Sequence, residues 1–224
     1  PSPQKKEYML LYKLIIFIIF ISFSYTQIED IIASIYTVEG ECYIKNNRIN
    51  LQYKNALPGR NVYSGDIVKS TDESYCSIYF KDNKTSIKIG PNSSVQLFDD
   101  YLVREITIKQ GDIYIKNIHN DDKKMYLFTS ISQIFVDHDR IWLTADYLEG
   151  DKIFSLDQSV QLSSIPNNSN YKVDAKQIYE ISNKGVVSLN HNLFLIPNYV
   201  ESDMNKEDFS YDIELKKDDL IPIY

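Results

Sequence analysis

The two cysteines are the residues whose chemistry is easiest to define. Cys42 lies on the apolar side of a strand-like run with Ile44, and Cys76 shares its side with Ile78 and Phe80. In an oxidising compartment two such thiols can pair, closing a loop of about 34 residues that stabilises a fold by roughly 3–4 kcal/mol. The alternative is two separate core thiols, because free cysteine is among the most buried residue types. The sequence leaves both alternatives open.

Acidic and histidine residues offer few further candidates for chemistry. Asp137-His138-Asp139 has the composition of a metal site, but three adjacent residues in one turn converge poorly on one ion, and no HxxxH or CxxC pair accompanies them. We interpret this cluster as a solvated turn. There is no G-x-S-x-G, P-loop or H-E-x-x-H motif. We therefore expect no catalytic residue, no metal and no cofactor, and a protein that is not an enzyme.

Tyrosine is unusually abundant, with 18 Tyr and 10 Phe in 224 residues. Tyr75 and Tyr79 alternate with Cys76 and Ile78, so they are predicted to point outward from their strand. Outward tyrosines can form a binding surface for a glycan or a protein. The alternative is ordinary cross-strand pairing within the sheet.

The elements that position these residues are predicted to be strands. Residues 75–80, 85–89 and 95–98 alternate between apolar and polar side chains and are separated by turn signals at close spacing. All seven glycines fall at predicted turns rather than inside a strand. We predict an all-β fold, an antiparallel two-sheet sandwich or roll over residues 33–190, preceded by an N-terminal hydrophobic signal or anchor helix.

The motif residues of this region resemble the FecR domain, in the order L-x-x-G, G-D, T-x-x-x-S-x-C-x-I-x-F, D-N-x-T and I-x-I-x-P-x-S. The residues that carry the resemblance are Leu57, Gly59, Gly65, Asp66, Thr71, Ser74, Cys76, Ile78, Phe80, Asp82, Ile87, Ile89, Pro91 and Ser94. FecR-like domains lie on the outer side of the bacterial inner membrane, and the founding type relays a signal to a cytoplasmic sigma factor. The resemblance implies the fold more strongly than the function.

Two later positions depart from the FecR pattern. The glycine and threonine of a V-x-G-T-x-F segment are missing at residues 136–142, which leaves the turn at residues 137–140 uncertain. Lys176 occupies the glycine position of the closing x-A-G-Q-x-x-x-I segment. Only a short stretch precedes the first apolar run, so we expect the resemblance to cover the outer domain without a cytoplasmic anti-sigma region.

Four segments are predicted along the chain. Residues 1–27 form a signal peptide or N-terminal membrane anchor, because residues 14–24 are an apolar run shorter than the roughly 20 residues of a spanning helix. Residues 33–120 form the FecR-like β core, and residues 121–190 continue it. Residues 191–224 form an acidic tail, whose part from residue 201 onward carries eight acidic and three basic side chains.

The net charge of −7, with no basic patch, argues against nucleic acid as a partner. From the resemblance and the missing catalytic motifs we expect an exported, non-catalytic protein in the periplasm or at the cell surface. It would bind an envelope protein, with a role in signal relay or regulation, and would touch the membrane only through its N-terminal segment. The alternative is a structural or polysaccharide-binding surface protein.

Overall fold

The computed structural model describes residues 31–46, 52–82, 84–118, 123–137, 139–190 and 197–200. These residues form seventeen strands and a helical turn at residues 198–200, so the all-β prediction is confirmed. The predicted N-terminal signal or anchor lies outside the described residues. Within the described part of the chain, no helix is both long enough and apolar enough to cross a membrane.

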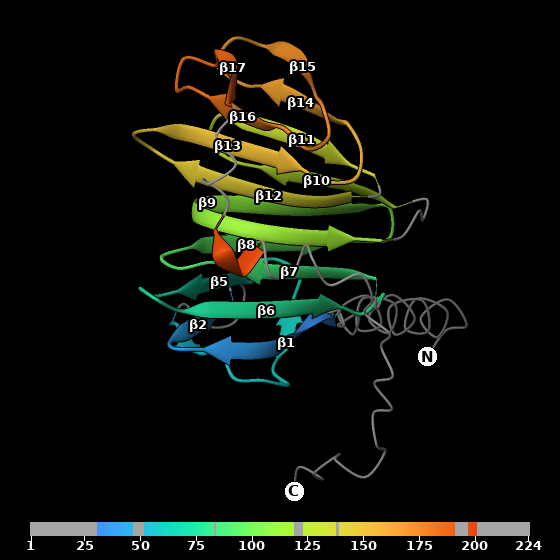
Figure 1. The fold of residues 1–224 in the computed structure, drawn as a ribbon. Helices are drawn as coiled ribbons and strands as arrows, with labels where there is room; N and C mark the ends of the chain where they lie inside the picture. Colours follow the sequence, from blue (N-terminus) through green and yellow to red (C-terminus); the bar gives the residue numbers. More distant parts are fainter. Residues whose placement is uncertain are drawn as a thin grey trace, which may run out of the picture.

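The strands form two layers that are stacked face to face, with β1 near one end of the stack and β17 near the other (Figure 1). Strand pairing gives the first layer, layer A, the order β4 (Asn61–Tyr63), β1 (Ile31–Glu39), β6 (Tyr75–Phe80), β7 (Thr85–Ile89), β9 (Val103–Asn117), β12 (Asp139–Asp146), β13 (Gly150–Ser155), β16 (Ile178–Ile181) and β17 (Val187–Asn190). The second layer, layer B, has the order β3 (Lys54–Asn55), β2 (Cys42–Lys45), β5 (Ile67–Ser70), β8 (Ser94–Asp99), β9, β10 (Lys124–Phe128), β11 (Ser132–Val136), β14 (Val160–Ser164) and β15 (Ser169–Val173).

β9 belongs to both layers. Its first half pairs with β8 and β10, and its second half pairs with β7 and β12. The bend lies at Gly111, whose φ is +85° and whose added Cβ would lie 2.6 Å from the Cα of Ser93. The prediction that every glycine marks a turn between strands is therefore wrong at Gly111, which lies inside one strand. All described pairings are antiparallel except that of β9 with β10, which is parallel.

The alternation of the sequence builds the core between the layers. Cys76, Ile78 and Phe80 on β6 are buried, and Ile87 and Ile89 on β7 lie beside them. Burying this much apolar surface is the main driving force for a sandwich of this kind.

Polar corners join the layers along one edge, where the chain crosses between them. The Glu41 N–H donates to the Ser74 hydroxyl at 2.9 Å, and the Thr71 N–H donates to the Glu41 carbonyl at 3.0 Å. The Asn92 N–H then donates to the Thr71 carbonyl at 3.0 Å, which connects successive corners. Serine and threonine serve here because short hydroxyls satisfy the backbone groups that a crossing chain leaves unpaired.

Two sequence predictions for individual elements need correction. β12 begins at Asp139, so residue 139 is in a strand rather than in a turn at residues 137–140. β1 begins at Ile31, two residues before the predicted start of the β core at residue 33.

Candidate binding groove

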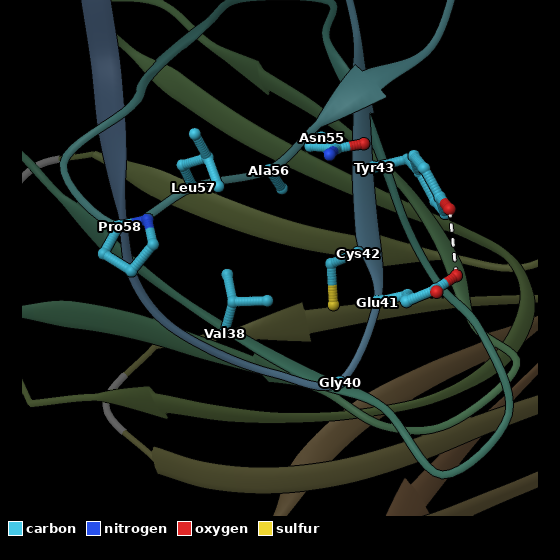
Figure 2. A pocket seen from close by; sticks show the side chains of 9 residues that line it. All are labelled: Val38, Gly40, Glu41, Cys42, Tyr43, Asn55, Ala56, Leu57 and Pro58. Atoms are coloured by element: carbon cyan, nitrogen blue, oxygen red, sulfur yellow. Dashed lines mark hydrogen bonds between the residues drawn. The ribbon is translucent and has the colours of Figure 1, made fainter.

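A groove of about 320 Å³ lies beside β1 and β2 (Figure 2). One wall is the corner from β1 to β2, and the other is the segment that crosses from layer B to layer A between β3 and β4, residues 56–60, called here the crossing segment. The lining combines apolar and polar surface and is made of Val38, Gly40, Glu41, Cys42, Tyr43, Asn55, Ala56, Leu57 and Pro58.

The crossing segment is fixed by backbone hydrogen bonds to both layers. The Ala56 N–H donates to the Cys42 carbonyl at 2.8 Å. The Gly59 N–H donates to the Ile35 carbonyl at 2.8 Å, and the Ile35 N–H donates to the Arg60 carbonyl at 2.9 Å. The groove is therefore preformed rather than assembled from a loose loop.

The rim of the groove is an open strand edge. β4 pairs with β1 only at residues 31–34, and the outer edge of Ile35 bonds to the crossing segment. Beyond that point, residues 37–39 pair with β6 on their inner side, and no described strand pairs with their outer side. An edge of this kind presents backbone N–H and C=O groups to which an extended peptide can add.

Two polar groups of the groove, the Tyr43 hydroxyl and the Glu41 carboxylate, are hydrogen-bonded to each other. The Tyr43 hydroxyl donates to the Glu41 carboxylate at 3.0 Å, and this hydrogen bond raises the pKa of Tyr43 above its ordinary value. Leu57 on the opposite wall is 61% exposed. An exposed apolar side chain on one wall and a tyrosine–carboxylate pair on the other suit a peptide that has an apolar residue and a polar neighbour.

The structure brings the two predicted cysteines together. Cys42 on β2 and Cys76 on β6 are both buried, and the Cys42 thiol donates to the carbonyl of Tyr75, the residue before Cys76, at 3.4 Å. Both are free thiols here. The disulfide between these residues stays a prediction, and so does the alternative of two free core thiols.

The predicted tyrosine surface is partly covered by the chain itself. Tyr75 and Tyr79 are half-buried on the outer face of layer A. The Tyr79 ring packs edge-on against Tyr36 with centroids 4.7 Å apart, and the Tyr75 ring lies 5.1 Å from that of Tyr199. The structure therefore favours packing for Tyr75, whereas Tyr36 and Tyr79 remain at the surface.

Part of the predicted acidic tail enters the fold. Val200 is fully buried in an outer cluster with Tyr114, Trp142, Phe154 and Ile178. The Tyr199 hydroxyl donates to the Asp112 carboxylate, to which the Trp142 indole N–H also donates at 3.3 Å. Burial raises the pKa of Asp112, while these donors act in the opposite direction. The remainder of the tail lies outside the described residues.

Several buried acids were not identified from the sequence. Asp151 accepts hydrogen bonds from the Thr129 and Ser132 hydroxyls, and Asp139 accepts one from Ser155. Asp139 is therefore not part of a solvated turn as predicted. Its inward orientation follows from its place at the start of β12, where strand alternation turns it into the core.

A buried arginine completes these polar clusters. The Arg104 guanidinium donates to Asp82 at 2.8 Å and to Asp99 at 3.1 Å, and it lies 3.8 Å from the centroid of the Phe80 ring. Burial works to raise the pKa of Asp82, but the Arg104 charge and several hydrogen bonds hold it below its ordinary value. Fully satisfied clusters of this kind stabilise the fold rather than provide a reactive group. No group of three or more metal-binding side chains gathers among the described residues.

The residues that carry the FecR resemblance lie in the scaffold. Gly59 and Gly65 adopt left-handed φ values of +81° and +94°. Thr71 and Ser74 form a corner between layers, and Asp82 holds Arg104. Of the resemblance residues, only Leu57 lines the groove. These positions therefore indicate how the chain folds and say little about what it binds.

No family model and no curated protein matches the chain. Two crystal structures, at 2.50 Å and 1.65 Å resolution, of a protein provisionally named as an anti-sigma factor from Parabacteroides distasonis ATCC 8503 are similar to it. Each has a TM-score of 0.49 and 9% identity, and the match covers 55% of this chain and 58% of that chain. The match thus spans little more than half of either protein, and at this level it supports no conclusion about function.

Proposed function

We propose that this chain is an exported, non-catalytic, FecR-like module that binds a protein partner in the bacterial cell envelope, in signal relay or regulation. The observation that carries the proposal is the outer edge of residues 37–39 in β1, which no described strand covers, beside a preformed groove. The partner would add an extended segment to this edge, because backbone pairing supplies affinity while a side chain in the groove supplies specificity.

The proposed location of the module rests on the sequence rather than on the fold. The apolar run at residues 14–24 supports export, and the resemblance supports a place outside the inner membrane. Reading the N-terminus of the mature chain from cells tests this part. If a signal peptide is cleaved, the mature chain begins near residue 25, whereas an anchored chain keeps residues 14–24.

Site-specific photo-cross-linking in intact cells tests the binding site. A photo-reactive benzoylphenylalanine replaces Leu57 in one strain and Leu102 in another. The two leucines have matched exposures of 61% and 63%, but Leu102 lies in the turn before β9, outside the groove. We expect one protein adduct at position 57 and none at position 102. Equal adducts at both positions, or none at either, would contradict the proposal.

The affinity of the captured partner gives a second measure. Leu57→Asp should weaken binding by at least about tenfold, because burying a leucine contributes roughly 1.5–3 kcal/mol and each 1.4 kcal/mol is tenfold in affinity. Leu102→Asp should leave the affinity unchanged. The alternative, a surface protein that binds polysaccharide, rests on the exposed Tyr36–Tyr79 pair. It predicts retention on cell-wall glycan that Tyr36→Ala removes and Leu57→Asp does not.

A further inference from the structure

The two thiols occupy one corner of the sandwich and are not equivalent. Cys76 has no exposed surface, and the core surrounds it. Cys42 is 3% exposed and lines the floor of the groove, where its sulfur is drawn beside Val38 and Gly40 (Figure 2). A reagent in the groove therefore reaches Cys42 first.

The contacts of the two thiols bring their strands together. The Cys42 thiol donates to the carbonyl of Tyr75, the residue before Cys76, at 3.4 Å, so β2 and β6 are in direct contact here. The neighbouring Cys76 thiol lowers the pKa of Cys42, although burial opposes this effect. The Cys42 thiol and burial both raise the pKa of Cys76. Cys42 lines the groove and Cys76 does not, so Cys42 is the group that an incoming disulfide meets, as its thiolate is the nucleophile in disulfide exchange.

We propose that Cys42 and Cys76 form a dithiol–disulfide site, in which Cys42 reacts with a disulfide that enters the groove and Cys76 resolves the product. In the first step the Cys42 thiolate attacks one sulfur of the incoming disulfide, whose S–S bond breaks and releases one thiolate. Cys76 then loses its proton and attacks the Cys42 sulfur, which releases the second thiolate. Two protein thiols are oxidised, one external disulfide is reduced to two thiols, and the new bond ties β2 to β6.

Oxidised glutathione is the probe for this reaction. The folded, reduced chain is incubated with it, and the remaining thiols are alkylated after unfolding and mapped by mass spectrometry. In the wild type we expect a Cys42–Cys76 disulfide. In Cys76→Ser we expect glutathione retained on Cys42, and in Cys42→Ser we expect Cys76 to stay unmodified until the chain is unfolded.

Two results would overturn the proposal. One is wild-type protein that keeps both thiols through the incubation, and the other is Cys76 that reacts as fast as Cys42 in the single variants. The wild-type result stands even where a serine variant fails to fold. The site is also independent of the proposed function, because a missing cross-link at position 57 leaves thiol exchange in the purified chain unaffected.

Discussion

Asp151 should make this fold less stable as the pH rises, whereas most acids in folded proteins make the fold more stable as the pH rises. The carboxylate is 2% exposed at the start of β13, and two hydroxyl groups are its hydrogen-bond donors. No described lysine or arginine forms an ion pair with it. Burial raises the pKa of Asp151 to about 6, against an ordinary value of 3.8, although the two hydroxyls act in the opposite direction.

The size of the effect follows from linkage. A pKa raised from 3.8 to about 6 corresponds to about 3 kcal/mol, at 1.36 kcal/mol for each unit. Because the folded state holds the proton more tightly than the unfolded chain, this stabilisation is fully present below pH 3.8. It is lost as the pH rises through about 6, so at pH 7 and above the ionised Asp151 destabilises the fold relative to its protonated form.

The assay is urea unfolding, followed by the fluorescence of the single tryptophan, Trp142, at several values between about pH 4.5 and 8. Asp151→Asn keeps the shape and cannot ionise. The variant should therefore gain stability relative to the wild type by about 2 kcal/mol between pH 4.5 and 8, because about 1 kcal/mol of the full effect is already lost at pH 4.5. Burial also raises the pKa of Asp112 and Asp139, but their effects cancel in the difference between the two proteins.

A matched control separates this effect from a general change of charge. Asp174→Asn removes an exposed acid from the same half of the sandwich. It should leave the pH dependence of stability close to that of the wild type. A stability difference between wild type and Asp151→Asn that stays constant from pH 4.5 to 8 would refute the reasoning, since it would mean that Asp151 titrates alike in both states.

Two further predictions concern residues with left-handed backbone. Gly111→Ala should lower the free energy of unfolding by about 3 kcal/mol or more, because an alanine at this φ is strained and its Cβ overlaps Ser93. Gly59→Ala should lower the free energy of unfolding by only about 1 kcal/mol, because its Cβ would meet no atom within 4 Å. Equal losses for the two glycines in urea unfolding would show that the corner can relax. Lys176→Gly should raise the free energy of unfolding by about 0.5–1 kcal/mol, because Lys176 has a φ of +63°. A Lys176→Gly variant less stable than the wild type in the same assay would contradict this reasoning.

The sequence by itself determined the local structure of this protein. The alternation at Tyr75–Phe80 and Thr85–Ile89 predicted both the strands and their buried sides, and both are as predicted. Lys176, which occupies a glycine position of the FecR pattern, has a left-handed φ of +63°. These features depend on neighbours within a few residues, so the pattern along the chain contains the information that fixes them.

Only the tertiary structure decided which distant segments meet. It placed Cys42 against the strand that contains Cys76, turned Asp139 and Asp151 into the core, and left the outer side of residues 37–39 without a described partner strand beside the groove. It also brought Val200 from the predicted tail onto the outer face of layer A. These features depend on segments that are separated in the chain. Strand alternation specifies which side of a strand is buried, but it does not specify which segment lies next to that side.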